Sequence, residues 1–580
     1  MLHVELDSIV GDFMRRTLYF LEPDDSCAEA ARIMMESNVG SVFVAENGVP
    51  VGIVTERDML GKVLGEGREP DDIKLKEIMS SPIISVSPYV KVAEALEIMA
   101  HNGFRRLLVM DGDKPVGIIA QRFTIQEEVE FLRSKAYQPA EEAMRYHPFY
   151  QGKVEVSLKV PVRSIDDFAI WYTPGVAEPC KDIQKDPLRV YDHTNKGNSI
   201  AIVTDGTRVL GLGDIGPEAA LPVMEGKSLL FRYLGGVDAQ AICVNTTDPD
   251  EFVEVVKAIQ PAYGGVNLED IAQPKCFDIL DRLEKEAVIP VWHDDQQGTA
   301  TVVLAGFLNA LKIVNKSLDQ VRVALIGAGA SNIRTARLLM AAGVDPKELF
   351  VVDSTGILHI GRDDLEGRYP QKWEIAQVTN GEGRTGGIRE ALKRADAVVA
   401  LSRPGPGVIT IEDIGVMAPN PIVFACANPI PEIWPWEATE AGAGVVATGR
   451  SDFPNQVNNS LGFPAIFRGV LDVRSTRITD EMCIAAAEEL ALIAEEKGLH
   501  AQAILPTMED WELFPRVATA VGMKAQELGF AQLEISKEDL YRAAHHRIER
   551  ARAIVENSME RGFIQEPPPE ETVIYDKTPA

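Results

Sequence analysis

The chain has few cysteines for its length and few basic residues relative to acidic ones. Its 580 residues include only six cysteines, and no two of them have the C-x-x-C spacing that is typical of zinc or redox sites. Scattered cysteines exclude a disulfide-stapled secreted scaffold and favour a reducing compartment, so we expect a cytoplasmic protein. With 87 Asp and Glu against 58 Lys and Arg, the formal net charge is −29, which argues against nucleic acid or an anionic membrane as a partner.

Long apolar runs are also missing. No window approaches the ~18 consecutive apolar residues of a membrane span. The N-terminus has no basic stretch followed by an apolar run, so a signal peptide is not expected. The hydrophobic content of 46% is ordinary for a soluble globular protein, and 580 residues exceed what one core supports. We therefore expect roughly three or four domains.

Two segments near the N-terminus repeat each other. Residues 28–60 align with residues 93–125 without a gap, so that Pro50-Val51-Gly52-Ile53 matches Pro115-Val116-Gly117-Ile118. Each copy has the pattern of an amphipathic helix followed by two short apolar strands. The turns between these strands contain Asn47-Gly48 and Asp111-Gly112, residues that tolerate positive φ and therefore predict hairpins.

The tandem repeat resembles a pair of CBS domains, with copies at about residues 10–65 and 75–130. Such pairs commonly bind adenine nucleotides in the cleft between the repeats, and the resemblance implies Thr55, Arg57 and Asp58 as nucleotide-binding residues. The second copy has Ala120 and Phe123 in place of Thr55 and Asp58, so at most one such site is expected. The alternative is that Thr55 and Asp58 only cap the next helix, and that the repeat is structural or dimerising.

Five segments between residues 171 and 300 gather side chains suited to acid/base chemistry. They supply a phenol, an amine, a guanidinium and several carboxylates, which fits proton transfer on a small carboxylic acid beside a divalent metal. In chain order they are Trp171–Cys180, VTDGTRVLGLGDIG (203–216), PVMEGK (222–227), NLEDIA (267–272) and HDDQQGTA (293–300). The glycines and apolar residues around Arg208 and Lys227 predict that both lie at strand ends.

These segments, in this order, resemble malic enzyme, the oxidative decarboxylase of malate, over about residues 140 to 550. The resemblance implies that Lys227 is the general base, that Tyr172 is the acid that protonates the enol, and that Arg208 binds the substrate carboxylate. A lysine that is neutral near pH 7 needs a lowered pKa, so we expect Lys227 to be buried beside other cations. The family alone implies a homodimer or a higher homo-oligomer.

Three carboxylates form the expected metal site. Glu269 and Asp270 are adjacent, and Asp295 follows 25 residues later. Neighbouring carboxylates inside a helix diverge, whereas at a strand end or a helix start both can reach one ion. An all-oxygen site favours Mg²⁺ or Mn²⁺ over zinc. The resemblance places Asp294 beside the ligands, and His293 is interpreted as a packed or capping residue.

A glycine-rich turn follows the buried strand predicted at residues 321–326. The turn and the helix start after it, with Gly327, Gly329, Ala330 and Ser331, predict a dinucleotide site at a helix N-terminus. Asp353 ends the next strand, where a carboxylate accepts a ribose hydroxyl and repels a 2′-phosphate, so we expect NAD with NADP less favoured. Asn332 replaces the third glycine of the fingerprint, and the nearby Arg362 blurs the preference.

Further strands are predicted at residues 396–401, 422–427 and 445–448, and helices at 478–496 and 537–559. The resemblance implies that Asn428 binds cofactor or substrate and that Asn459 binds substrate, although asparagine is also a common turn former. The tail after about residue 565 is Pro- and Glu-rich and is expected to be loosely ordered.

The expected fold is α/β, with an N-terminal CBS pair, a malic-enzyme substrate domain, a Rossmann-type doubly wound parallel sheet and a helical C-terminal segment. The predicted boundaries are 1–132 for the tandem CBS domains, 133–150 for a helical connector, 151–290 for the substrate domain, 291–475 for the NAD-binding domain and 476–580 for the C-terminal helical segment with its tail.

The resemblance implies that (S)-malate is oxidatively decarboxylated to pyruvate and CO₂ as NAD(P)⁺ is reduced, with possible regulation by a nucleotide at the CBS pair. Two alternatives are a malolactic-type decarboxylase that releases lactate, and a nucleotide-sensing CBS protein whose catalytic half is inactive. The intact set of ionisable residues argues against the last alternative.

Overall fold

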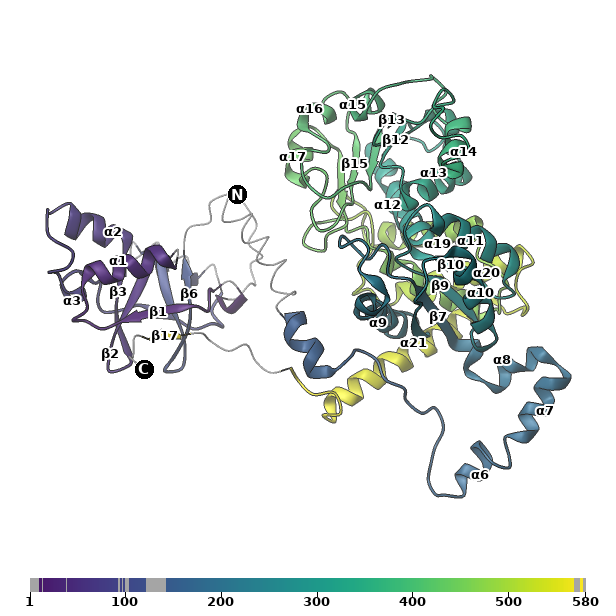
Figure 1. The fold of residues 1–580 in the computed structure, drawn as a ribbon, viewed down its shortest axis with the longest axis horizontal. Coiled ribbons are helices and arrows are strands. Elements are labelled where there is room, and N and C mark those ends of the chain that lie inside the picture. The colour runs from purple at the N-terminus through teal and green to yellow at the C-terminus, as the bar shows by residue number, and fades with distance from the viewer. Residues whose placement is uncertain are drawn as a thin grey trace. The chain divides into compact units, whose positions relative to one another are not determined.

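The chain divides into two compact units in the computed structural model (Figure 1). The small unit comprises residues 1–146 and 567–580, and the large unit comprises residues 147–566. The structure describes residues 10–12, 14–37, 39–91, 94–95, 98–99, 104–120, 142–567 and 574–576. Residues 142–150 are helical, whereas residues 133–141 of the predicted connector lie outside the described residues.

The small unit contains the predicted repeat, with one hairpin in each of its two sheets. Its elements are β1 Leu18–Leu21, α1 Cys27–Glu36, β2 Ser41–Glu46, β3 Val49–Thr55, α2 Glu56–Asp58, α3 Leu75–Ile78, β4 Ser85–Val86, β5 Arg106–Asp111 and β6 Lys114–Ala120. The strand orders are β17-β1-β2-β3, in which β17 is Ile574–Asp576, and β4-β5-β6. The hairpin turns at Asn47-Gly48 and Gly112 have positive φ, as predicted.

The two copies agree in detail. The β2–β3 ladder shifts register between Val44 and Ala45, and the β5–β6 ladder shifts between Val109 and Met110, the matching positions of the second copy. A side chain added at Gly52 would meet the sulfur of Met79 at 2.6 Å, and one added at Gly117 would meet the sulfur of Met14 at the same distance. The glycine of each Pro-Val-Gly segment therefore makes room for a methionine.

The C-terminal tail differs from the expectation in one place. Ile574–Asp576 form the short strand β17, which pairs in parallel with β1 through the register Leu18↔Ile574, Tyr19↔Tyr575 and Phe20↔Asp576. The sequence pattern did not indicate this strand, because its partner lies more than 550 residues earlier in the chain.

The large unit is built on two mainly parallel sheets. The first has the order β10-β9-β7-β8, and the second has the order β13-β12-β11-β14-β15-β16. Their strands are β7 Ser199–Thr204, β8 Asp238–Cys243, β9 Gly265–Leu268, β10 Val291–His293, β11 Val323–Ile326, β12 Leu349–Asp353, β13 Gly356–Ile357, β14 Ala397–Ala400, β15 Ile422–Ala425 and β16 Val445–Thr448. In the second sheet the strand order reverses between β11 and β14, which is where ligands of doubly wound folds bind.

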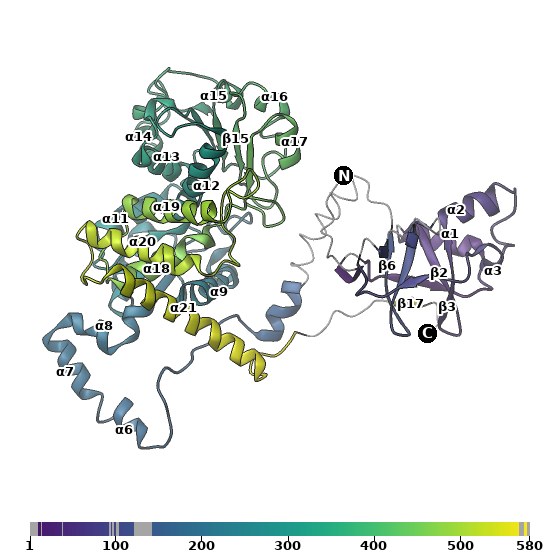
Figure 2. The ribbon, with the colours of Figure 1, turned by 180° about the vertical axis from the view of Figure 1, so that it is seen from behind.

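Helices cover both faces of the second sheet, with α13 and α14 on one side and α16 and α17 on the other (Figures 1 and 2). The helices of the large unit are α6 Asp167–Trp171, α7 Ala177–Lys185, α8 Val190–His193, α9 Gly216–Gly235, α10 Pro249–Ile259, α11 Lys275–Glu286, α12 Thr299–Val314, α13 Ala330–Ala342, α14 Pro370–Val378, α15 Ile388–Leu392, α16 Ile411–Ile414, α17 Pro435–Glu440, α18 Phe463–Asp472, α19 Asp480–Glu496, α20 Leu513–Glu527 and α21 Lys537–Glu560. The predicted Rossmann-type fold is confirmed.

The larger of two hydrophobic core clusters in the described part of the large unit extends over several of its segments. It joins apolar side chains of β7–β10, α12, β11 and α18–α21, so the predicted substrate, dinucleotide and C-terminal segments share a core. One helical segment, Asp294–Val314, has the length and composition of a membrane span, with a hydropathy of 1.3. Since 72% of this window is buried inside the fold, it is better explained as a core helix.

A segment of residues 160–193, which we call the arm, carries α6, α7 and α8. None of these three helices contains a buried residue. Figures 1 and 2 show α6 and α7 projecting away from both sheets of the large unit. The arm therefore has no hydrophobic core of its own, and we call its end at α8, where it joins the rest of the large unit, its root.

Candidate active site

Three carboxylates converge at the carboxyl ends of β9 and β10. One carboxylate oxygen from each of Glu269, Asp270 and Asp295 lies within 4.8 Å of the others. Glu269 and Asp270 directly follow β9, and Asp295 follows β10, which runs parallel beside β9. Strand ends thus bring together residues 25 positions apart, in the geometry that the sequence pattern predicts.

The cluster fits a hard divalent cation. Burial, together with Asp295, raises the pKa of Asp270 to about 8, and burial raises the pKa of Glu269 well above its usual range. Asp270 Oδ2 is buried and has no hydrogen-bond partner within the described part of the chain. Asp270 also has a φ of 55°, a conformation that is costly for a residue with a side chain. Crowded, orphaned carboxylates of this kind are stabilised by a bound Mg²⁺ or Mn²⁺.

Lys227 lies against this cluster. It is in the middle of α9, so the prediction that it lies at a strand end is wrong. Its Nζ is 3.0 Å from Glu269 Oε1 and 2.5 Å from Asp294 Oδ2, and it lies 4.2 Å from the centroid of the Phe463 ring. The side chain is only 12% exposed.

The charge state of Lys227 also differs from the expectation. Burial lowers the pKa of its amine, but Asp294 and Glu269 outweigh burial and raise the pKa above its ordinary value. The sequence predicted that Lys227 is buried, but it did not predict that its neighbours are carboxylates. Asp294 was expected only to lie beside the metal ligands. Asp294 is thus a site residue that the sequence pattern missed, because it forms an ion pair with Lys227.

Asn459 belongs to the same site. Its Nδ2 donates to Asp294 Oδ2 at 3.0 Å and to Thr299 Oγ1 at 3.0 Å, which fixes the carboxylate that faces Lys227. His293 is fully buried, its Nδ1 is 3.7 Å from Asp295 Oδ2, and burial lowers its pKa. A buried, neutral His293 agrees with its interpretation as a packed residue.

Arg208 and Asn428 are both exposed and lie in loops that approach each other. Arg208 is exposed in the loop after β7, and its backbone N–H donates to the Asp270 carbonyl at 3.0 Å. A Cβ added at Gly211, in the same loop, would lie 3.5 Å from the carbonyl oxygen of Asn428, which follows β15. The loop after β7, which carries Arg208, therefore approaches the segment after β15, which carries Asn428.

Tyr172 is the one predicted catalytic residue that the fold keeps apart from the others. It is the C-cap of α6 in the arm and is 72% exposed. Figures 1 and 2 show α6 well away from α9, which carries Lys227. Within one chain, the predicted acid Tyr172 and the predicted base Lys227 are not brought together.

The predicted dinucleotide turn lies between β11 and α13. Gly327 has a φ of 97°, and a Cβ there would meet the Leu401 carbonyl at 2.6 Å. Gly329 is the N-cap of α13, and a Cβ there would enter open space in front of Ala330 and Ser331. Asn332 is tolerated at the third glycine position because its buried Nδ2 donates to the Ile326 carbonyl at 2.9 Å. These residues fit a pyrophosphate at the helix N-terminus.

Asp353 ends β12 as predicted, but its carboxylate already accepts hydrogen bonds from neighbouring residues. Arg362 donates to both oxygens at 3.1 and 3.2 Å, Lys372 Nζ is 3.1 Å from Oδ2, and Thr355 N donates to Oδ1 at 2.9 Å. A ribose hydroxyl must therefore share this acceptor with two cations. Those cations also reduce the repulsion that Asp353 alone would exert on a 2′-phosphate.

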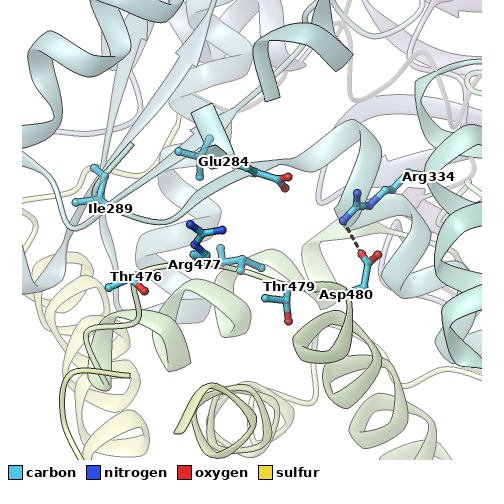
Figure 3. Close-up of a pocket in the computed structure, with 9 residues that line it drawn as sticks. Glu284, Ile289, Arg334, Thr476, Arg477, Thr479 and Asp480 are labelled. Atoms are coloured by element: carbon cyan, nitrogen blue, oxygen red, sulfur yellow. Dashed lines mark hydrogen bonds and ion pairs between the residues drawn. The ribbon is translucent and has the colours of Figure 1, made fainter. Parts of the chain in front are cut away.

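A cavity of about 220 Å³ lies elsewhere in the large unit (Figure 3). Its lining comes from the end of α11, the start of β10, α13 and the segment before α19, and an Arg334–Asp480 ion pair of 2.5 Å lies at one side. Ile289 and Val291, which line the cavity, lie at the amino end of β10, whereas Asp295 follows its carboxyl end. None of the predicted site residues lines this cavity.

In the small unit, Thr55 and Asp58 form the capping box that the sequence offered as the alternative. Thr55 Oγ1 donates to Asp58 Oδ2 at 2.6 Å and accepts from the Asp58 N–H at 3.3 Å. Lys62 Nζ pairs with Asp58 at 2.8 Å, while Arg57 is exposed. The capping role is present, and nucleotide binding stays a prediction.

An open parallel sheet with a glycine turn at a helix N-terminus, next to a carboxylate cluster and a buried lysine, is typical of metal-assisted, dinucleotide-dependent oxidoreductases. Comparison with known families agrees. Residues 151–284 match the N-terminal domain of malic enzyme, residues 296–526 match its NAD-binding domain, and residues 10–65 and 75–122 match the CBS domain. The chain belongs to the malic enzyme family, and it carries a CBS pair at its N-terminus.

Three curated relatives are similar to the large unit. The bifunctional malic/malolactic enzyme of Bacillus subtilis is 51% identical over 69% of this chain and 96% of its own. The NAD-dependent malic enzyme of Geobacillus stearothermophilus is 49% identical over 66% of this chain and 78% of its own. The NADP-dependent malic enzyme of Halomonas elongata is 44% identical over 67% of this chain and 94% of its own.

Among solved structures, the malic enzyme from Pyrococcus horikoshii is 50% identical and superposes with a TM-score of 0.69, covering 71% of this chain and 95% of its own. The fold and the family expected from the sequence are thus confirmed. Relatives that use NAD and relatives that use NADP are both similar to this chain.

Proposed function

We propose that the large unit oxidatively decarboxylates (S)-malate to pyruvate and CO₂ while reducing NAD⁺, with NADP⁺ accepted less well. The observation that carries the proposal is the buried Lys227 between Asp294 and the three-carboxylate cluster, in a chain of the malic enzyme family. The test is Mn²⁺-dependent reduction of the dinucleotide by L-malate, with pyruvate measured in the same reaction.

The side chains divide the work as follows. Arg208 binds a malate carboxylate, and Lys227 accepts the proton of the 2-hydroxyl. After the β-carboxyl group leaves as CO₂, Tyr172 protonates carbon 3 of the enol of pyruvate. A divalent cation held by Glu269, Asp270 and Asp295 would polarise the 2-oxygen, and the dinucleotide would accept the hydride.

The ion pairs of Lys227 explain how the amine becomes a base. With Glu269 and Asp294 both paired to it, the amine is charged and cannot accept a proton. A divalent cation held by Glu269 would remove one of the two anionic partners of Lys227 and add a nearby positive charge, which would lower the pKa of the amine.

We infer that the protein is a homodimer in which the arm of one copy completes the site of the other. The exposed Tyr172, and the absence of buried residues in the helices of the arm, support this arrangement. Ile165, which is 82% exposed, and Ile170, which is 60% exposed, add apolar surface suited to contact a second copy.

Mixing two inactive variants tests the shared site. Tyr172→Phe and Lys227→Ala subunits, exchanged at equal concentrations, are expected to regain roughly a quarter of wild-type activity, because half of the dimers are mixed and each has one intact site. Activity is measured as NADH formation after subunit exchange. If the mixture stays as inactive as its components although exchange is shown by mass, Tyr172 does not act across a dimer.

The cofactor preference is proposed to depend on Lys372 as well as Asp353. Lys372→Ala is expected to lower kcat/KM for NADP⁺ by about tenfold or more, because the variant loses a cation beside the 2′-position. The value for NAD⁺ should change by no more than about threefold. Steady-state kinetics with both dinucleotides check this, and equal losses for the two would contradict it.

For the small unit, we propose that an adenine nucleotide binds at Thr55, Arg57 and Asp58 and modulates activity. Support comes from the polar residues at the end of β3 and the start of α2, which the second copy replaces by Ala120 and Phe123. Asp58→Ala is expected to abolish the effect of AMP or ATP on NADH formation while leaving basal activity unchanged. If neither nucleotide alters activity or the melting temperature of the wild-type protein, the small unit has no such role.

A second activity, release of lactate from malate, is favoured by one comparison, since the Bacillus subtilis relative is a bifunctional malic/malolactic enzyme. Formation of lactate from malate without release of NADH would identify this malolactic activity. The cytoplasmic location stays a prediction, and all six cysteines are unpaired.

A further inference from the structure

Arg474 has an unusual backbone conformation for a residue with a long side chain. It follows Val473, the C-cap of α18, and has a φ of 49°. Helices commonly place glycine at this position, because a Cβ is strained in the left-handed region. The contacts of its side chain therefore decide whether Arg474 has a role that glycine could not fill.

The side chain of Arg474 holds the root of the arm. Its guanidinium pairs with the carboxylate of Asp192 and lies 5.1 Å from the ring centroid of Tyr191, both in α8. Lys196 Nζ lies 5.4 Å from the same ring centroid and donates to the carbonyls of Gln260 and Pro261 at 2.7 and 2.9 Å. Two cations, each fixed to the rest of the large unit, thus contact α8.

From α8 the contacts continue along the arm to Tyr172. Arg189 Nε and His193 Nε2 lie 3.1 and 2.7 Å from Asp182 Oδ2, which ties α8 to α7. Val176, the N-cap of α7, donates its N–H to the Tyr172 carbonyl at 3.0 Å. Because the arm helices bury no side chain, these polar contacts set the direction in which Tyr172 projects.

We propose that Arg474 is a positioning residue, which fixes the arm at α8 and so directs Tyr172 into the active site that it completes. The role rests on the proposed function, in which Tyr172 supplies the proton to the enol. Arg474 itself touches neither substrate nor cofactor, and it acts through Tyr191 and Asp192. Its loss should therefore lower kcat without weakening the binding of malate to Arg208.

The test uses Arg474→Gly in the full-length protein. Glycine suits the backbone conformation, so the variant is expected to fold, with a melting temperature within about 3 °C of the wild type. We expect kcat to fall by about tenfold or more, since a small misplacement of a catalytic group is costly, and KM for malate to change by no more than about threefold. The matched control is Arg394→Gly, because Arg394 also has a positive φ, of 58°, but is exposed and lies outside the arm. It should keep wild-type kinetics.

A double variant separates positioning from a general structural effect. If Arg474 acts through Tyr172, adding Arg474→Gly to Tyr172→Phe lowers kcat no further. A further loss equal to that of the single variant would overturn the proposal, as would an unchanged kcat in Arg474→Gly. If Tyr172→Phe itself keeps full activity, the proposed acid is wrong, which is a failure of the proposed function that this series identifies separately.

Discussion

Replacement of Lys227 by alanine is expected to lower kcat for malate oxidation by about a thousandfold. A positioned general base contributes 10²–10⁴-fold, and Lys227 is the buried amine that faces both Asp294 and the carboxylate cluster. The loss equals about 4 kcal/mol of transition-state stabilisation. NADH formation at saturating L-malate and Mn²⁺ measures it directly.

The control for this variant is Lys257→Ala. Lys257 also pairs with two carboxylates, Glu254 and Glu286, each at 2.9 Å, but on the surface of the large unit. Its loss should leave kcat within about twofold, because exposed ion pairs contribute little. If Lys227→Ala retained more than about a tenth of the activity while correctly folded, the amine would not be the base.

The second large effect is expected at two adjacent aspartates. Asp295→Asn should weaken Mn²⁺ binding by about a hundredfold or more, because it removes one of three anionic oxygen ligands. Asp294→Asn should bind Mn²⁺ almost as well as the wild type, since Asp294 faces Lys227 and Asn459 rather than the cluster. Both variants should lose most of their activity.

Calorimetric titration of each purified variant with Mn²⁺ separates the two roles, and the fold can be checked by the melting temperature without metal. The two positions are adjacent in sequence and lie in the same site, although Asp294 is fully buried and the side chain of Asp295 is partly exposed. Equal losses of Mn²⁺ affinity in the two variants would mean that the metal site also includes Asp294, and the division of roles between the two aspartates would fail.

The sequence predicts the regular elements well because their signals are local. The Asn47-Gly48 turn and the glycine turn at Gly327 each depend on a few neighbouring residues, the repeat is visible as a direct match of two segments, and all three are present in the structure. Glu269, Asp270 and Asp295 could be predicted to converge because parallel strands end at the same edge of a sheet.

What the sequence could not predict depends on long-range contacts. The raised pKa of Lys227 arises from Asp294, 67 residues later, and the occupied carboxylate of Asp353 depends on where Arg362 and Lys372 fold back. The isolation of Tyr172 in the arm is likewise a property of packing, because α6 has the composition of an ordinary helix but no core to join.

The most direct test of the central claim is the product balance of one reaction. Purified protein with L-malate, Mn²⁺ and NAD⁺ should form NADH and pyruvate in equal amounts, and chelation of the metal should stop both. Lactate without released NADH would instead show a malolactic activity. Neither product from folded, metal-loaded protein would contradict the account, and would leave the small unit as the functional part of the chain.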